Sequence, residues 1–455
     1  MATTTVSIGS NQSIDTAVPA SSSADGSDWV ITWNKTLSAS VSVGDLATAT
    51  DHDDGAFVYL IIAISGSNYT LKYISGTGGN QSPYALCTDS YCSAPPTFTF
   101  KRAFSTITAF EEMVDDTSNL YWGASDDVIG ECHADGTFTS DSRVYFTTKQ
   151  SLSSVTLTAY DGERHGGTTG AGDTQVVVKP SSGAGHNNGI IDVNIDDFTI
   201  EFIDIDFNDL DTTNTNKAIV LRGTNNNNII RSNLIHDKNG NPGNTGPYGI
   251  HAVGAGASSD SIYIFNNIVY NLVETSNDTA SAINTHVWAG NAYIYNNTVY
   301  NIQGAGGSKH GLGFRFGNPS SSNTRIKNNI ASKCEGSNKD AAFWKNSSGS
   351  TVDSANNLSD DTSDAAYNAE DMGQNLNDSS ALTGKTLAEI AFVSTSAAAE
   401  DLHIRRSSVC NRAGVSLGST NKVNIDIDGE TIFNNWAIGA DFIADGPTFL
   451  FSMLT

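Results

Sequence analysis

Hydrophobic and polar residues alternate in short runs along most of the chain. A period of two is the signature of β-strands, because successive side chains of a strand point to opposite faces. Tracts rich in Gly, Ser and Asn separate these runs and predict tight turns. The clearest alternating runs cover residues 29–33, 57–64, 198–205, 261–265 and 291–295. The pattern predicts an all-β protein.

One polar phrase recurs through the second half of the chain. An asparagine followed by a β-branched or leucine residue stands at Asn233, Asn267, Asn297, Asn329 and Asn357, with spacings of 34, 30, 32 and 28 residues. Periods of this size indicate stacked repeats that bury their apolar faces against one another. Short strands within each repeat predict a right-handed parallel β-helix. The asparagines are expected to stack from coil to coil, or to adopt the left-handed turn conformation; the two interpretations are compatible.

The pattern divides the chain into four parts. Residues 1–100 show dense alternation without the asparagine repeat, which predicts a small antiparallel β domain used for attachment. Residues 101–118 form a linker and a capping helix, residues 119–400 form the parallel β-helix, and residues 401–455 form a C-terminal cap with an apolar tail. A second short helix is expected near residues 387–390.

The capping helix has an apolar face made of Ile107, Phe110 and Val114. Ser105 or Thr106 is a candidate N-cap, and the Thr108–Glu111 spacing fits a capping box. A helix just before a β-helix can cover the open edge of the first coil, which would otherwise invite edge-to-edge association. We expect Phe110 to pack on that end.

Charge and composition narrow the range of partners. The 49 acidic and 24 basic side chains give a formal charge of −25, which argues against a nucleic-acid partner because phosphate binding requires clustered Lys and Arg. The chain has no apolar run long enough to predict a membrane span. Its start has neither a basic leader nor an apolar core, so no signal peptide is expected. Five cysteines include Cys87 and Cys92, which are either disulfide-bonded or two free thiols.

An acidic run between residues 192 and 211 is the first candidate for chemistry. Asp204 and Asp206 fall on one face of a strand and could serve as acid and base for glycoside cleavage, with Arg231 nearby. Together with Asp196 they could instead bind calcium, the one cofactor that the sequence offers. The plainer interpretation is a solvated outer face beside the inward Ile203 and Ile205.

Outward aromatic side chains are the second candidate. Tyr263, Tyr293 and Tyr295 lie in equivalent repeats and could form a platform for sugars, although some of these rings must belong to the core. The Arg325–Lys327 segment matches a motif of β-helix galacturonan hydrolases, but strand alternation also explains it. Four histidines lie in separate repeats and are expected at turns or facing solvent: His236, His251, His286 and His310.

Several segments resemble proteins of tailed bacteriophages from marine environments. They are residues 43–45, 73–79, 101–111, 128–136 and 162–168, together with 401–403, 411–414, 426–429 and 438–441 near the C-terminus. The last four resemble the terminal signature of right-handed β-helix surface proteins. The resemblance implies a virion-exposed rod and carries over no catalytic residue.

Two functions follow from the sequence. In the first, the chain is a structural virion protein, such as a fibre, spike or capsid decoration. It would be assembled in the host cytoplasm without a signal peptide, attached to other virion proteins through its N-terminal domain, and able to bind host or environmental glycans. In the second, it is a tailspike-type polysaccharide depolymerase. The apolar tail and the fibre role predict a homotrimer.

Overall fold

The computed structural model describes most of the 455 residues. The described residues are 2–25, 28–51, 55–75, 97–116, 121–140, 143–169, 175–181, 189–206, 217–223, 226–240, 246–254, 259–274, 279–304, 310–317, 323–336, 339–345, 351–360, 380–417, 423, 425–431 and 436–442. The chain is nearly all β and contains parallel solenoid coils and one antiparallel sheet, which confirms the predicted fold class.

The chain forms two compact units. The described residues up to 229, apart from 166–169, make up the first unit, and residues 166–169 together with those from 230 onward make up the second. Strand β18 (Asn228–Arg231) straddles this division. Each unit is described by itself below.

An antiparallel sheet of seven strands opens the first unit. Its order is β2-β8-β5-β6-β7-β4-β3. The strands are β2 (Asp15–Ala17), β3 (Pro19–Asp25), β4 (Asp28–Trp33), β5 (Leu46–Asp51), β6 (Gly55–Ser65), β7 (Asn68–Ser75) and β8 (Phe98–Lys101). Its core centres on Trp33, which contacts Tyr69, Phe98 and Phe100 edge to face.

The first strand of the chain belongs to the solenoid instead of this sheet. Strand β1 (Thr3–Ile8) pairs in parallel with β9 (Asp127–Cys132), from Thr3 opposite Asp127 to Ile8 opposite Cys132. Residues 1–100 are therefore not one antiparallel module. The alternation did not predict a strand at residues 3–8, and no local pattern specifies the parallel partner of such a strand.

Three parallel sheets continue the first unit. The first joins β1, β9, β12 (Ser154–Ala159) and β15 (Phe198–Glu201). The second joins β10 (Phe138–Ser140), β13 (Val177–Pro180) and β16 (Asp204–Asp206), and the third joins β11 (Val144–Phe146), β14 (Ile191–Val193) and β17 (Lys217–Arg222). A single 3₁₀ turn, η1, spans Asp161–Glu163.

Helix α1 (Ile107–Asp115) buries the predicted face. Ile107, Phe110 and Val114 are buried, and the Phe110 ring lies so close to Gly130 of β9 that a Cβ there would sit 2.7 Å from it. Phe110 therefore packs on an early coil, as expected. The cap is Thr106, whose hydroxyl accepts from the Ala109 N–H, so the predicted Thr108–Glu111 capping box is wrong because the helix starts two residues earlier.

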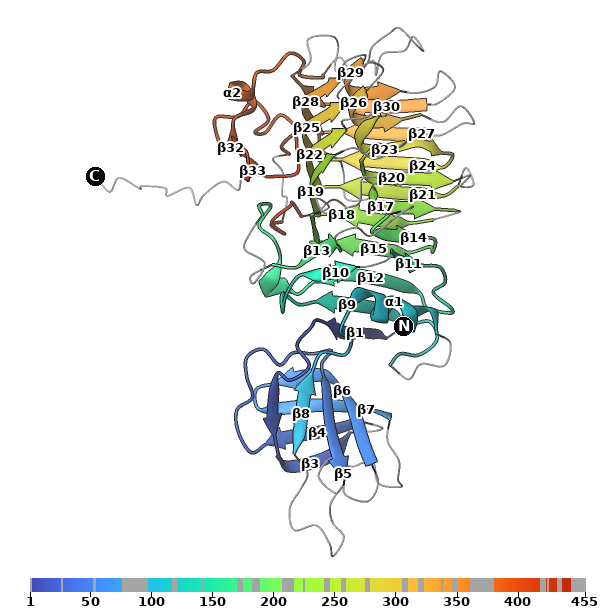
Figure 1. Ribbon diagram of the computed structural model, residues 1–455, viewed down its shortest axis with the longest axis vertical. Coiled ribbons are helices and arrows are strands. Elements are labelled where there is room, and N and C mark those ends of the chain that lie inside the picture. The colour runs from blue at the N-terminus through green and yellow to red at the C-terminus, as the bar shows by residue number, and fades with distance from the viewer. Residues whose placement is uncertain are drawn as a thin grey trace, which may run out of the picture. The chain divides into compact units, whose positions relative to one another are not determined.

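The second unit stacks its coils regularly (Figure 1). One sheet joins β21 (Ser261–Phe265), β24 (Asn291–Tyr295), β27 (Asn323–Lys327) and β30 (Thr351–Ala355). Another joins β19 (Leu234–Gly240), β22 (Ile268–Glu274), β25 (Thr298–Gly304), β28 (Ile330–Gly336) and β31 (Leu358–Ser359). The third joins β20 (Tyr248–Gly254), β23 (Ala280–Trp288), β26 (His310–Phe316) and β29 (Lys339–Lys345).

The recurring asparagines form a buried ladder at the corner between two of these sheets. Each side-chain N–H of Asn233, Asn267, Asn297 and Asn329 donates to the side-chain oxygen of the next member, at 3.0 Å in every case. The residue before each member, from Ser232 to Asn356, has φ between 51° and 58°. Stacking and left-handed turns therefore occur together, on adjacent residues.

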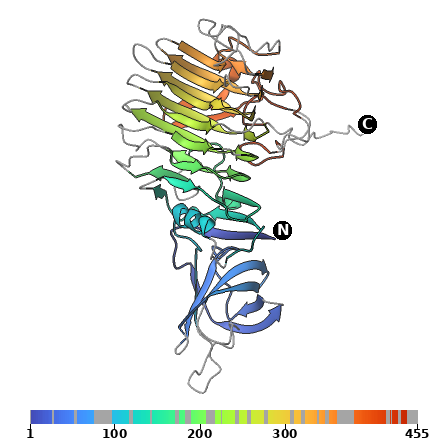
Figure 2. The ribbon, with the colours of Figure 1, turned by 90° about the vertical axis from the view of Figure 1, so that its right-hand side faces the viewer.

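The C-terminal segment lies along the side of the second unit's coils (Figure 2). It contains α2 (Leu387–Ile390), β32 (Phe392–Ser396) and β33 (Ala399–Ile404). Ile390, Leu402, Cys410 and Ile438 pack with Ile268, Tyr270, Tyr300 and Ile330 in one core cluster. Side chains before the ladder hold the segment as well: Asn356 donates to the Ala413 carbonyl, Asn328 to that of Val415 and Ser232 to that of Asp426. The apolar tail, 449–454, lies outside the described residues.

Candidate functional site

The acidic pair proposed from sequence lies on β16 and has protein partners. Asp204 is buried and accepts a hydrogen bond from the Gln175 side chain at 2.7 Å. Asp206 is partly exposed and forms an ion pair with Lys179 at 2.5 Å. Both partners come from the preceding coil, so each carboxylate helps to hold two coils together.

The structure does not bring the rest of the predicted acidic set together. Asp196 is exposed just before β15, where its carboxylate accepts from the Asn226 backbone N–H. Asp196, Asp204 and Asp206 do not together form one of the described groups of three side chains whose ligand atoms all lie within 4.8 Å of one another. Arg231 ends β18, which belongs to a different sheet from β16.

The outward tyrosines lie on the β21-β24-β27-β30 sheet of the second unit. Tyr263, Tyr293, Arg325 and Asp353 are in register across its four strands. A parallel row beside them consists of Ser261, Asn291, Asn323 and Thr351. We call these two rows the tyrosine face. Ile262 and Ala292, which lie between the rows, are buried and point inward.

Ring stacking determines what the tyrosine face can offer a ligand. The Tyr263 and Tyr293 rings stack with centroids 4.7 Å apart and planes inclined by 10°. Arg325 lies above the Tyr293 ring, with its guanidinium carbon 5.1 Å from the centroid. Tyr293 therefore uses its faces on Tyr263 and Arg325, and the partly exposed pair presents ring edges and hydroxyls. Burial, followed by the neighbouring Tyr293, raises the pKa of Tyr263, which keeps this hydroxyl protonated as a donor.

Tyr295 does not contribute to this face. Its side chain is 1% exposed, and burial raises its pKa. The sequence could not separate Tyr295 from Tyr293, because both fall on the outward side of the same strand. Tyr295 ends β24, next to the corner of the coil.

Arg325 and Lys327 follow plain strand alternation around the buried Ile326. Arg325 is exposed, and Lys327 forms an ion pair with Asp353 at 2.8 Å. Galacturonan hydrolases use this motif together with several clustered aspartates. Among the described residues of this sheet, the aspartate beside the motif is Asp353 alone. What remains is an exposed guanidinium within a row of aromatic, amide and hydroxyl groups.

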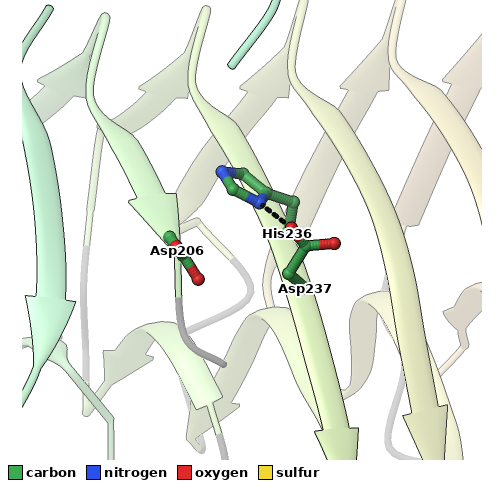
Figure 3. A group of neighbouring side chains, drawn as sticks. All are labelled: Asp206, His236 and Asp237. Carbon is green, nitrogen blue, oxygen red and sulfur yellow. Dashed lines mark hydrogen bonds and ion pairs between the residues drawn. The ribbon is translucent and has the colours of Figure 1, made fainter. Parts of the chain in front are cut away.

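The four repeat histidines lie on two sheets. His236 and His251 are buried, which contradicts the expected solvent-facing or turn positions. Figure 3 shows His236 bonded through Nδ1 to Asp237 of the same strand, at 2.9 Å, and its ring stacks on Tyr270. Asp206, drawn in the same figure, belongs to the first unit. Burial and then Arg315 lower the pKa of His286 to about 4, so this ring is neutral at physiological pH.

Sequence reasoning missed a charged cluster around His403 of β33. Its Nδ1 lies 2.6 Å from Asp401 and its Nε2 lies 3.1 Å from Asp428. The ligand atoms of His403, Asp428 and Asp441 all lie within 4.8 Å of one another. These residues come from three separate segments of the predicted terminal signature. Their acidic and histidine content was visible in the sequence, but their convergence was not.

A second polar network is buried in the first unit. Arg102 is 2% exposed and donates to Asp45 at 3.1 Å and to Asp135 at 2.7 Å. Beside it, His133 lies 3.4 Å from the Ser42 hydroxyl and 3.3 Å from Glu163. The sequence of contacts from Ser42 to His133 to Glu163 resembles the serine–histidine–acid triad of hydrolases. The Ser42 oxygen is also shared with Asp45 and Arg102 at 3.4 Å and is buried, so the network is structural.

Comparisons of the chain with protein-family models and with curated proteins find no match. Within the described residues, none of the helices has the length and apolar character needed to cross a bilayer. The function of these candidate sites must therefore be inferred from their own residues.

Proposed function

We propose that this protein is an exposed structural component of a tailed bacteriophage virion that binds host or environmental glycans on its tyrosine face. The phage assignment is supported by the sequence resemblance, and the glycan assignment by the residues of the second unit. The observation that carries the binding proposal is the in-register Tyr263–Tyr293–Arg325 row, which is at least partly exposed on a parallel sheet.

Recognition on this face would be mainly polar. Glycans present many hydroxyls, and the two rows supply tyrosine hydroxyls, amides and one guanidinium. Neighbouring coils repeat these groups at the spacing of parallel strands, about 4.8 Å. An extended saccharide can therefore contact several coils at once, and the stacked ring edges add apolar contact.

Glycan-array or titration measurements with the purified full chain test the proposal. Tyr293→Ala removes the ring that joins Tyr263 to Arg325, and we expect affinity to fall by about fivefold or more. Tyr145→Ala is the matched control, because Tyr145 is also partly exposed and also carries an arginine, Arg143, 3.7 Å above its ring. Equal loss in both variants, or no glycan binding by the parent protein, would contradict the proposal.

Its location is tested on particles. Antibodies against this chain should label intact virions in electron micrographs and should show whether the label falls on head or tail. Detection of the chain only in lysate, with purified particles unlabelled, would refute the virion role.

A separate assay tests the alternative function, a polysaccharide depolymerase. Incubation with host polysaccharide, followed by measurement of reducing ends and unsaturated uronates, should give no products. If products appear and Asp204→Asn abolishes them, the non-enzymatic proposal fails and Asp204, Asp206 and Arg231 become the catalytic candidates.

A further inference from the structure

The charged cluster in the C-terminal segment has the composition of a cation site. His403 and Asp401 lie on β33, Asp428 lies in the turn at 426–430, and Asp441 lies near the end of the described chain. The Asp441 carboxylate also accepts from the Ile404 N–H at 2.9 Å. Three segments that are distant in sequence therefore meet at one imidazole.

Negative charge is in excess around this imidazole. The groups that face it are Asp401, Asp428 and Asp441, with Asp426 fully buried beside Asp428. These carboxylates outnumber the single imidazole, so the surroundings favour added positive charge.

Asp426 provides an independent observation. One of its carboxylate oxygens accepts from the backbone N–H groups of Asp428 and Glu430, at 3.1 and 2.8 Å. The other oxygen, Oδ2, is buried and has no hydrogen-bond partner in the described structure. An unpaired buried carboxylate oxygen is costly unless a cation or donor satisfies it.

The orientation of His403 matches that of a metal-binding histidine. Metal-bound imidazoles commonly bind the ion through one nitrogen and donate the other N–H to a carboxylate, which fixes the ring. Here Asp401 is bonded to Nδ1, while Nε2 faces Asp428. Gly167 lies beside Nε2, and a Cβ at that position would come within 2.6 Å of it. Only glycine lets the backbone approach the ring this closely, because any side chain there would overlap it.

We propose that His403 Nε2, Asp428 and Asp441 bind one divalent transition-metal cation, of the zinc or manganese class, and that Asp401 positions the imidazole. A set with one nitrogen and carboxylate oxygens suits these ions better than Ca²⁺ or Mg²⁺, which prefer oxygen ligands alone.

A bound metal would link two parts of the C-terminal segment to each other. The metal joins β33 to the 426–441 region, which is also held by Ser232 through the Asp426 carbonyl and by Thr298 through the Ala440 N–H. Since a bound ligand stabilises only the folded form, the melting temperature of the protein should depend on metal concentration.

The experiment uses full-length protein stripped with EDTA and titrated separately with Zn²⁺, Mn²⁺, Ca²⁺ and Mg²⁺. We expect one Zn²⁺ or Mn²⁺ per chain by plasma mass spectrometry and a rise in melting temperature. Asp428→Asn and Asp441→Asn should abolish both effects, and Asp401→Asn should weaken affinity by about 10–100-fold. Asp353→Asn, an exposed aspartate paired with Lys327, should change nothing.

Parent protein loaded with Co²⁺ keeps the test decisive if a variant fails to fold. X-ray absorption should show one imidazole nitrogen with oxygen ligands and no sulfur. A thiolate signal would assign the metal to one of the five cysteines and overturn the proposal. Absence of stoichiometric binding, binding of Ca²⁺ alone, or unchanged binding in Asp428→Asn and Asp441→Asn would overturn it too.

Discussion

At the scale of single residues, the asparagine ladder shows why this sequence repeats. Asn297 is fully buried, and its side-chain N–H groups donate to the Ile264 and Tyr295 carbonyls and to the Asn329 side chain. Its oxygen accepts from the backbone and side chain of Asn267. One side-chain amide thus forms hydrogen bonds with backbone groups at the corner between two sheets.

Replacing Asn297 should therefore be costly. We expect Asn297→Ala to lower the free energy of unfolding by about 2–4 kcal/mol, because several buried donors and acceptors lose their partners. Denaturant unfolding followed by circular dichroism measures the change. Asn323→Ala, whose exposed side chain bonds Asn291, is the control and should cost no more than about 0.5 kcal/mol. Similar losses in both variants would contradict a special role for the ladder.

Arg102 is the second residue on which stability should depend. Its guanidinium lies between Asp45, which is fully buried, and Asp135. Arg102→Ala leaves these carboxylates without their cation and should lower the free energy of unfolding of the first unit by about 3–5 kcal/mol. Lys35→Ala, which removes an exposed partner of Asp15, should cost at most about 1 kcal/mol. If Arg102→Ala hardly changed the free energy of unfolding, water would have to replace the guanidinium beside the two carboxylates.

These residues also mark the limit of inference from sequence. The ladder was predictable because the same residue type recurs at a fixed interval. The partners of Asp204 and Asp206 were not, because Gln175 and Lys179 lie on another coil. The His403 cluster requires three segments to meet, and no local pattern encodes that meeting.

At the scale of elements, helix α1 shows how a local pattern and a tertiary contact agree. Its apolar spacing predicted the buried face, and Phe110 packs against Gly130, Phe104 and Phe146. The exact start of the helix was not predictable from hydroxyl residues alone, because Ser105, Thr106 and Thr108 all can cap. Strand β1 was not predicted, and its parallel partner β9 follows more than a hundred residues later.

The contact between Phe110 and Gly130 predicts strong coupling between the two positions. Phe110→Ala should cost about 3–5 kcal/mol by leaving a cavity, and Gly130→Ala should cost about 1–3 kcal/mol because its methyl meets the ring. The double variant should cost less than the sum, since the new methyl enters the vacated space. Additive losses, measured by denaturant unfolding of the three variants, would show that the ring does not rest on β9.

At the scale of the whole molecule, the thirty-residue repeat decided the fold class, since only stacked coils satisfy it. The repeat did not reveal where the described residues between 387 and 442 are placed. They lie along the coils and pack on Tyr270 and Tyr300, which explains why these two tyrosines are buried. The exposure of these tyrosines is therefore set by the C-terminal segment, which is not part of the repeat.

The apolar tail predicts the assembly state. Phe449, Leu450, Phe451, Met453 and Leu454 lie close together in the sequence near the C-terminus. Burial of such side chains is favourable by about 1.5–3 kcal/mol each, so exposure in a single chain is disfavoured. Multi-angle light scattering should give about three times the 48.0 kDa chain mass. Deletion of residues 446–455 should give single chains if the tail holds the trimer. A single-chain mass for the parent protein would refute the trimer, and an unchanged trimer after deletion would assign its interface to the coils.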